Sequence, residues 1–265
     1  MLSLPLTFIR ARAGMMQRTD KKARYTVPDI LRAVAVIAMV VYHTLWDMVY
    51  MFGADIPWYK TEAGFIFQQS ICWSFILLSG FCFSFGKRKL RRSVTVLVCA
   101  AVITAVTAIA MPENIILHGV LSLLGTAMLV TVPLEKIFKK IPPFVGLIIN
   151  AVLFALTYNV SDGVLGVGDM SVCLPDFLYA NSITAFFGFP HSGFRSSDYF
   201  PLLPWLFLFW CGYFICQLLK RKNLLRYLSS FSCRPLEFIG RHSLEIYMAH
   251  QPIIYAVLLV IYKIV

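Results

Sequence analysis

The chain has 265 residues, of which 59% are hydrophobic and only 14% are charged, and its mean hydropathy is +0.74. A soluble domain is about 45–50% apolar and about 25% charged, because the surface of a globule needs polar cover. The composition therefore excludes a soluble fold, and it equally excludes a disordered, collagen-like, coiled-coil or disulfide-scaffold chain. The sequence predicts an integral membrane protein.

Seven segments are long and apolar enough to cross a bilayer. A spanning helix needs about 20 apolar residues, because the hydrocarbon core is about 30 Å thick and each helical residue adds about 1.5 Å. The predicted spans are residues 29–51, 64–86, 93–111, 115–134, 144–159, 201–219 and 242–263. We therefore predict an all-α polytopic bundle over residues 29–265, preceded by a basic tail at residues 1–28.

Basic residues predict the orientation of this bundle. Four clusters hold 21 of the 24 lysines and arginines, at residues 10–32, 87–92, 136–140 and 220–241. They fall at alternate ends of the predicted spans, which by the positive-inside rule places the N-terminus in the cytoplasm and the C-terminus outside. The same placement explains the net charge of +11 by topology and attraction to anionic lipid, so we expect no nucleic-acid partner.

Two segments outside the predicted spans are residues 1–14 and residues 160–200. Residues 1–14 are a poor secretory signal, because no basic region precedes a short apolar run that Pro5 breaks. Residues 160–200 form the one long connection, and a connection of that length is usually functional or disordered. Its aromatic content favours packing, so we expect an outer cap with a short interfacial or re-entrant helix.

The spacing of the cysteines does not indicate a metal site, and no metal is expected.

The first predicted span carries an aligned set of ionisable side chains, which are costly in lipid and usually mark a functional site. At about 100° per residue, one stripe of the helix holds Asp29, Arg32, His43 and Asp47. An arginine at the inner mouth suits a phosphate, and a histidine about 16 Å further along is a common general base, whose tautomer Asp47 would fix. The simpler alternative is an interfacial Asp29–Arg32 pair and a His43 that bonds a neighbouring helix.

Three stretches of the chain resemble membrane acyltransferases. Residues 24–43 are similar to the first helix of acyltransferase family 3, in which ten residues separate an arginine from a histidine, as they separate Arg32 from His43 here. Residues 198–212 and 240–252 are similar to a bacterial domain of unknown function related to heparan-α-glucosaminide N-acetyltransferase. The resemblance covers nearly the whole chain from Arg24 onward, with its motifs in the same order.

This resemblance implies a bacterial inner (plasma) membrane enzyme that moves an acyl group from cytoplasmic acyl-CoA, in particular acetyl-CoA, to a sugar-type acceptor. The acceptor would offer a hydroxyl or an amine at the outer face. By the same analogy His43 is catalytic, and Arg32 helps to hold the CoA phosphates or the pantetheine arm. From the residues themselves we add Asp47, which would orient His43, and Asp29 and Arg241 as further residues of the CoA site. The implied partners are the CoA thioester, a glycoconjugate and membrane lipid, and a homo-oligomer is left open.

The remaining polar candidates each have a structural alternative. His250 and Gln251 precede Pro252 in the last span, where they either pair with His43 or only pack helices. Trp205 is an aromatic anchor or a substrate platform, and Asp198 is a candidate ligand for an acceptor hydroxyl. His118, near the outer end of the fourth span, is interfacial or touches the acceptor.

Two other classes of function compete with an acyltransferase. The same polar stripe would suit a transporter or a proton- or ion-conducting protein, since intramembrane Asp, His and Arg also form relays. A catalytically silent scaffold or receptor is the third class. Against transport, the sequence contains no evident inverted repeat of the kind that transporters often carry.

Overall fold

The computed structural model describes residues 25–264, and it confirms the all-α membrane fold with seven helices long and apolar enough to span a bilayer. These helices are α2 (Thr26–Tyr50), α3 (Glu62–Phe83), α4 (Lys89–Ala110), α5 (Val120–Phe138), α6 (Pro143–Thr157), α8 (Leu202–Arg221) and α10 (Ser243–Ile264). Helix α2 begins three residues before the predicted span, so it includes the end of the predicted basic tail. Residues 1–24, with the weak signal-like segment, lie outside the described residues.

Shorter elements join the spans. A short helix, α9 (Arg234–Arg241), follows α8 and packs on α2. The 3₁₀ turns are η1 (Pro57–Lys60), η2 (Pro112–Asn114), η3 (Val160–Asp162), η4 (Asp176–Tyr179) and η5 (Leu224–Ser229).

We call the ends of the spans that the charge pattern predicts to be cytoplasmic the inner ends. Lys89 and Glu135 form an ion pair of 2.7 Å that joins the inner ends of α4 and α5.

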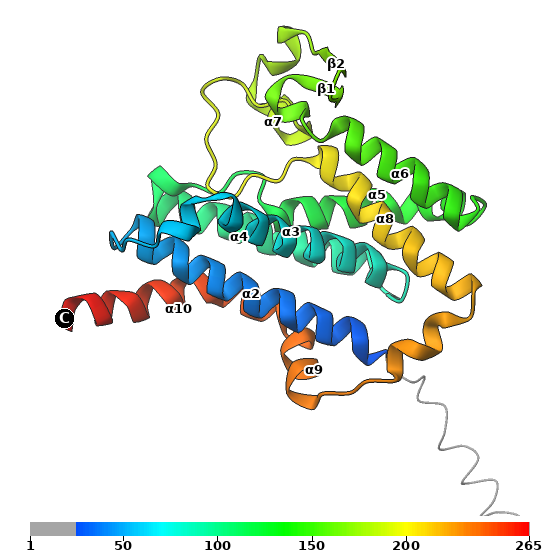
Figure 1. Ribbon diagram of the computed structural model, residues 1–265, viewed down its shortest axis with the longest axis horizontal. Coiled ribbons are helices and arrows are strands. Elements are labelled where there is room, and N and C mark those ends of the chain that lie inside the picture. The colour runs from blue at the N-terminus through cyan, green and yellow to red at the C-terminus, as the bar shows by residue number, and fades with distance from the viewer. Residues whose placement is uncertain (1–24, 265) are drawn as a thin grey trace, which may run out of the picture.

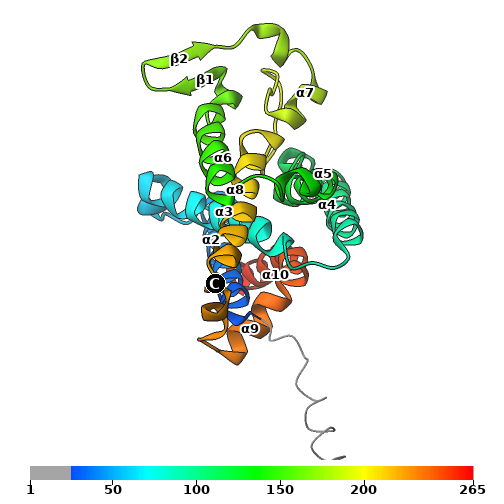
Figure 2. The same ribbon diagram turned by 90° about the vertical axis from the view of Figure 1, so that its right-hand side faces the viewer.

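Helix α8 is the centre of the bundle. It packs on both α3 and α6, whereas α4 pairs with α5 and α2 pairs with α3, α9 and α10 (Figures 1 and 2). Phe209, Tyr213 and Phe214 on α8 are each at most 1% exposed, so this helix supplies the largest buried side chains of the core. The helices around it expose apolar faces, which is expected where the surroundings are lipid.

Two glycines allow α3 and α8 to approach closely. A Cβ atom added at Gly212 would lie 2.1 Å from the carbonyl oxygen of Leu77, and one added at Gly80 would lie 1.8 Å from that of Phe209. Small residues commonly hold membrane helices together in this way, because lipid offers no hydrophobic drive for association. The contact fixes α3 relative to the central helix.

The long outer connection contains a β-hairpin that the sequence reasoning did not predict. Strands β1 (Val164–Val167) and β2 (Met170–Cys173) pair antiparallel, followed by the short helix α7 (Ser182–Phe187). The signal was the two-residue turn Gly168–Asp169, where Gly168 adopts φ +56°. A short helix in this segment was expected, and α7 is such a helix. The hairpin and α7 lie at the top edge in Figure 1.

Substitution of Gly212 tests the close contact of α3 with α8. We expect Gly212→Ala to lower the free energy of unfolding by about 1–3 kcal/mol, because the new methyl group meets a backbone carbonyl that cannot move aside. The measurement is the thermal unfolding midpoint in detergent. The control is Gly86→Ala, whose Cβ would meet its nearest atom at an ordinary 3.6 Å. Equal midpoints for the two variants would contradict the packing.

Candidate functional site

A cavity of about 1100 Å³ lies between α2, α3, α4, α5 and α10. Its wall includes Lys87, which follows α3, and Lys220 near the end of α8, so it reaches the inner ends of the spans. It also includes Val120, the first residue of α5, at the opposite end of that helix. The cavity therefore extends from the inner side of the bundle to the outer end of α5.

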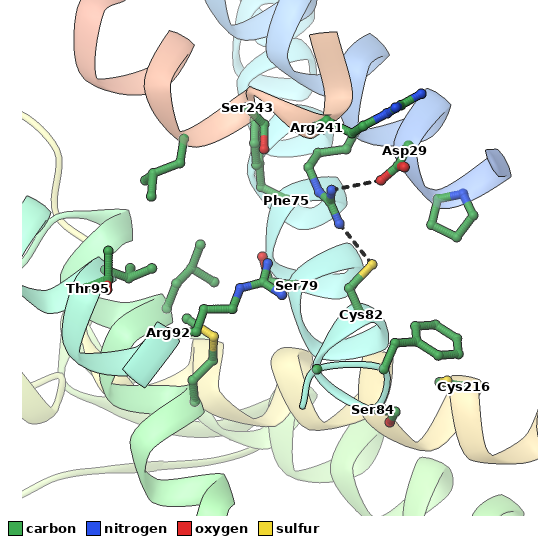
Figure 3. Close-up of a pocket in the computed structure, with 18 of the residues that line it drawn as sticks. Asp29, Phe75, Ser79, Cys82, Ser84, Arg92, Thr95, Cys216, Arg241 and Ser243 are labelled. Carbon is green, nitrogen blue, oxygen red and sulfur yellow. Dashed lines mark hydrogen bonds and ion pairs between the residues drawn. The ribbon is translucent and has the colours of Figure 1, made fainter. Parts of the chain in front are cut away.

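Cationic side chains gather in the inner part of this cavity (Figure 3). They are Arg32, Lys87, Arg92, Lys220 and Arg241. The acidic residues in the wall are Asp29 and Glu245, so positive charge dominates among the described lining residues. Arg92 extends from α4 toward Ser79 on α3, across the cavity (Figure 3). Such a cluster suits a ligand that carries several negative charges.

Arg32 is held in place by three different elements. Its Nη1 donates to Asp29 Oδ1 at 3.2 Å and to the Gly240 carbonyl oxygen at 3.1 Å, and its Nη2 donates to Cys82 Sγ at 3.0 Å. Gly240 permits this arrangement, because a Cβ there would lie 1.8 Å from the Asp29 carbonyl oxygen. The predicted Asp29–Arg32 pair is thus present, and the guanidinium is fixed in the cavity wall.

Arg241, on α9, contributes a second oriented cation. Its Nη2 donates to Glu237 Oε2 at 2.9 Å, and its side chain remains 40% exposed. A hydrogen bond from Ser232 and the charge of Arg241 lower the pKa of Glu237, so this carboxylate stays ionised beside the guanidinium. The structure therefore brings together the three predicted phosphate-site residues, Asp29, Arg32 and Arg241, in one cavity wall.

At the outer end of the cavity, Tyr247 meets Asp198. The Tyr247 hydroxyl donates to Asp198 Oδ2 at 3.5 Å, and the backbone N–H of Val120 donates to the same oxygen at 3.2 Å. Gly119 makes room for this carboxyl, since a Cβ at Gly119 would lie 2.9 Å from Oδ2. Burial raises the pKa of Asp198, against the effect of these two hydrogen bonds. Asp198 belongs to the outer connection and Tyr247 to the cavity wall, so this contact links the two.

Behind Tyr247, a polar cluster joins α2 to α10. The rings of His43 and His250 lie 4.8 Å apart and those of His250 and Tyr247 lie 5.3 Å apart, centroid to centroid. Gln251 Nε2 donates to Asp47 Oδ1 at 2.7 Å. We expected Asp47 to orient His43, but its hydrogen-bond partner is Gln251. The ring of His250 contacts both His43 and Tyr247, so the expected pairing with His43 and the alternative, a polar packing cluster with Tyr247, are present together.

The geometry shows which nitrogen of His250 donates. Its Nδ1 lies 2.6 Å from the Tyr247 carbonyl oxygen, which can only accept, so Nδ1 is the donor in this hydrogen bond. Four buried side-chain atoms of the described residues lack a hydrogen-bond partner, and three of them belong to this cluster. They are Asp47 Oδ2, His250 Nε2 and Gln251 Oε1. Buried polar groups are normally satisfied, so these three neighbouring atoms leave hydrogen-bonding capacity for a further group in the cluster.

The structure places the other predicted residues away from the cavity wall. His43 and Asp47 lie at the α2–α10 contact and are not among the described lining residues. Trp205 is 8% exposed and packs against Phe200 with ring centroids 5.3 Å apart, as a core side chain. The His118 ring lies 6.0 Å from that of Phe194, and burial lowers its pKa.

Sequence reasoning missed Arg92 and Cys82 as cavity residues and treated Tyr247 only as a packing residue. Arg92 was one of several basic residues in a cluster that topology already explained. Cys82 carried no motif, and its contact with Arg32 depends on how α3 packs on α2. The one sequence signal for Tyr247 was its position in residues 240–252, the stretch that resembles the acyltransferase relatives.

The described part of the chain is thus a seven-helix membrane bundle with a cation-lined internal cavity. Residues 24–252 match the model of the family described as heparan-alpha-glucosaminide N-acetyltransferase, catalytic, and the chain belongs to this family. No curated protein and no solved structure gives a significant match. The family and the fold together indicate a membrane acetyltransferase, which confirms the resemblance seen in the sequence.

The bond between Gln251 and Asp47 can be tested by substitution. We expect Gln251→Leu to lower the free energy of unfolding by about 1–3 kcal/mol, because the fully buried Asp47 carboxyl then loses its donor. Thermal unfolding in detergent measures the effect. Gln217→Leu is the matched control, since Gln217 donates at 3.1 Å to the neutral hydroxyl of Ser84. A loss for Gln251→Leu no larger than for the control would contradict the assigned contact.

Proposed function

We propose that the protein transfers an acyl group, acetyl in the simplest case, from acyl-CoA on the cytoplasmic side to a sugar-type acceptor at the outer face. The acceptor would supply a hydroxyl or an amine. The observation that carries this proposal is the shape and charge of one cavity, with cations at its inner part and the Tyr247–Asp198 contact at its outer end. A CoA thioester has the same division, with phosphates at one end and a thin, uncharged arm at the other.

The inner part of the cavity would hold the phosphates. Arg32 is already oriented by Asp29, Gly240 and Cys82, so little side-chain entropy is lost when it binds. Arg241 would add a second guanidinium and Arg92 a third from the opposite wall. Guanidinium–phosphate hydrogen bonds are strong because both groups are charged and paired donors match two oxygens.

The outer end of the cavity would hold the thioester, next to the polar cluster. In the reaction, the acceptor oxygen or nitrogen bonds to the acyl carbon and the C–S bond breaks. The proton of the acceptor passes to the base and from there to the departing sulfur, so CoA leaves as the thiol. His43 remains our proposed catalytic base, with His250 in contact with its ring. Asp47 is proposed to act in the same cluster through Gln251.

Asp198 is our proposed contact for the acceptor. It belongs to the outer connection, and its carboxyl already accepts a hydrogen bond from the outer end of α5. A sugar hydroxyl could be bound there by the carboxyl, close to Tyr247 on the cavity side. We propose that His118, whose ring lies against Phe194 of the outer connection, helps to shape the acceptor site. We propose that the buried Trp205 supports this site from below as a packing residue.

Two variants separate donor binding from transfer. We expect Arg32→Gln to raise the dissociation constant for acetyl-CoA by about tenfold or more, because charged hydrogen bonds contribute about 1.5–3 kcal/mol each. We expect His43→Gln to leave that constant unchanged and to slow acetyl transfer to glucosamine by about 100-fold or more. Thermal stabilisation by acetyl-CoA measures binding, since a ligand of the native state raises the unfolding midpoint.

Matched controls use the same substitutions elsewhere. Lys60→Gln removes an exposed cation of the outer side, and His191→Gln removes a histidine of the outer connection. Wild-type affinity in Arg32→Gln together with wild-type transfer in His43→Gln would contradict the proposed site. The absence of any stabilisation of the unaltered protein by acetyl-CoA would instead favour a transporter or channel.

A further inference from the structure

The β-hairpin of the outer connection has one face that is entirely apolar. In the observed register, Leu165 pairs with Val172 and Val167 pairs with Met170. Directly opposed residues point to the same face of a sheet, and so do residues two apart along a strand. These four side chains therefore share one face, which we call the apolar face.

The apolar face is uncovered by any described part of the chain. Leu165 is 39% exposed, Val167 55%, Met170 87% and Val172 67%. The opposite face carries Val164, Gly166, Ser171 and Cys173, so it has less large apolar surface. An isolated two-stranded hairpin is marginally stable in water, so an apolar face that is exposed at all four positions needs another surface to cover it.

The apolar surface continues onto neighbouring segments of the same outer connection. Phe177 in η4 is 73% exposed and Ile183 in α7 is 76% exposed. Between residues 163 and 189 the only charged residues are Asp169, in the hairpin turn, and Asp176. The segment contains no lysine or arginine, in contrast to the inner ends of the spans.

The position of the hairpin in the bundle identifies lipid as the covering surface. The hairpin directly follows α6 and packs against it. The span that contains α6 runs over 20 residues, Pro143–Asp162, and is about 30 Å long, which matches the hydrocarbon thickness. Strand β1 begins at Val164, two residues after this span, so the hairpin lies at its outer end.

The lateral surface of α6 is itself lipid-facing. Ile148, Ile149 and Val152 are 48–50% exposed on this helix. Figure 2 shows the hairpin at the edge of the molecule, beyond α6 and on the opposite side from α9. The hairpin therefore lies beside a surface that a bilayer covers already, and it extends outward from the bundle.

We propose that the hairpin is an interfacial anchor whose apolar face inserts into the outer leaflet of the membrane. Leu165, Val167, Met170 and Val172 would lie among the acyl chains, while Ser171 and the Asp169 turn would face the headgroups and water. The anchor would hold the outer connection, including Asp198, against the bilayer surface. The proposal does not depend on the enzymatic reaction, because it rests on the exposure and placement of the hairpin alone.

Tryptophan scanning with brominated lipid tests this proposal directly. Met170→Trp, Val172→Trp and Ser171→Trp would each be placed in nanodiscs of phosphatidylcholine with brominated acyl chains, and the emission added by the new tryptophan would be obtained by subtraction of the parent protein. We expect strong quenching at positions 170 and 172 and several times weaker quenching at position 171. Ile109→Trp on α4, where the side chain is 85% exposed, gives the lipid-facing reference, and Lys222→Trp gives the aqueous one.

The alternation along β2 makes the result decisive even if one variant is poorly folded, because 170 and 172 test the same face independently. Unchanged unfolding midpoints would show that each variant used is folded. Quenching at positions 170 and 172 no greater than at Lys222→Trp would overturn the proposal. Cross-linking between two chains through cysteines at position 170, together with that lack of quenching, would show that a second copy covers the face.

Discussion

The cost of leaving a polar group unpaired within a bilayer is the constraint on which this structure depends. Helix α2 carries a stripe of ionisable residues, and Asp29, Arg32 and Asp47 of this stripe each have a hydrogen-bond partner. Asp29 and Arg32 bond each other, and Arg32 also bonds α9 and α3 through Gly240 and Cys82. Near the other end of the helix, Asp47 bonds Gln251 of α10. These pairings determine where α3, α9 and α10 lie around α2.

The cavity follows from that arrangement. Because Arg32 holds α9 and α3 at the inner end of α2, its guanidinium forms part of a wall rather than a lipid-facing surface. The α4–α5 pair completes the opposite wall and adds Arg92. At the outer end, α10 presents Tyr247 to Asp198 of the outer connection. One internal space thus has a cationic inner part and a polar outer end, which is the division of charge that a CoA thioester requires.

Much of this could be predicted from the sequence, because lipid imposes simple rules. The seven spans follow from length and apolar content, and the alignment of Asp29, Arg32, His43 and Asp47 follows from helical periodicity. What the sequence could not provide is the choice of partner across the bundle. Helical periodicity placed Asp47 one turn from His43, but its partner Gln251 is 204 residues away. Arg92 is likewise a cavity residue only because of how α4 packs, and the hairpin has too few residues for a strong periodic signal.

The central claim is that the cationic part of the cavity receives acyl-CoA from the cytoplasmic side. It is tested most directly by the binding of radiolabelled acetyl-CoA to sealed membrane vesicles of known orientation that contain the protein. The account predicts saturable binding to inside-out vesicles, greatly reduced in Arg32→Gln, and no such binding to right-side-out vesicles until they are permeabilised. Equal binding from both sides, or binding that Arg32→Gln does not change, would contradict it.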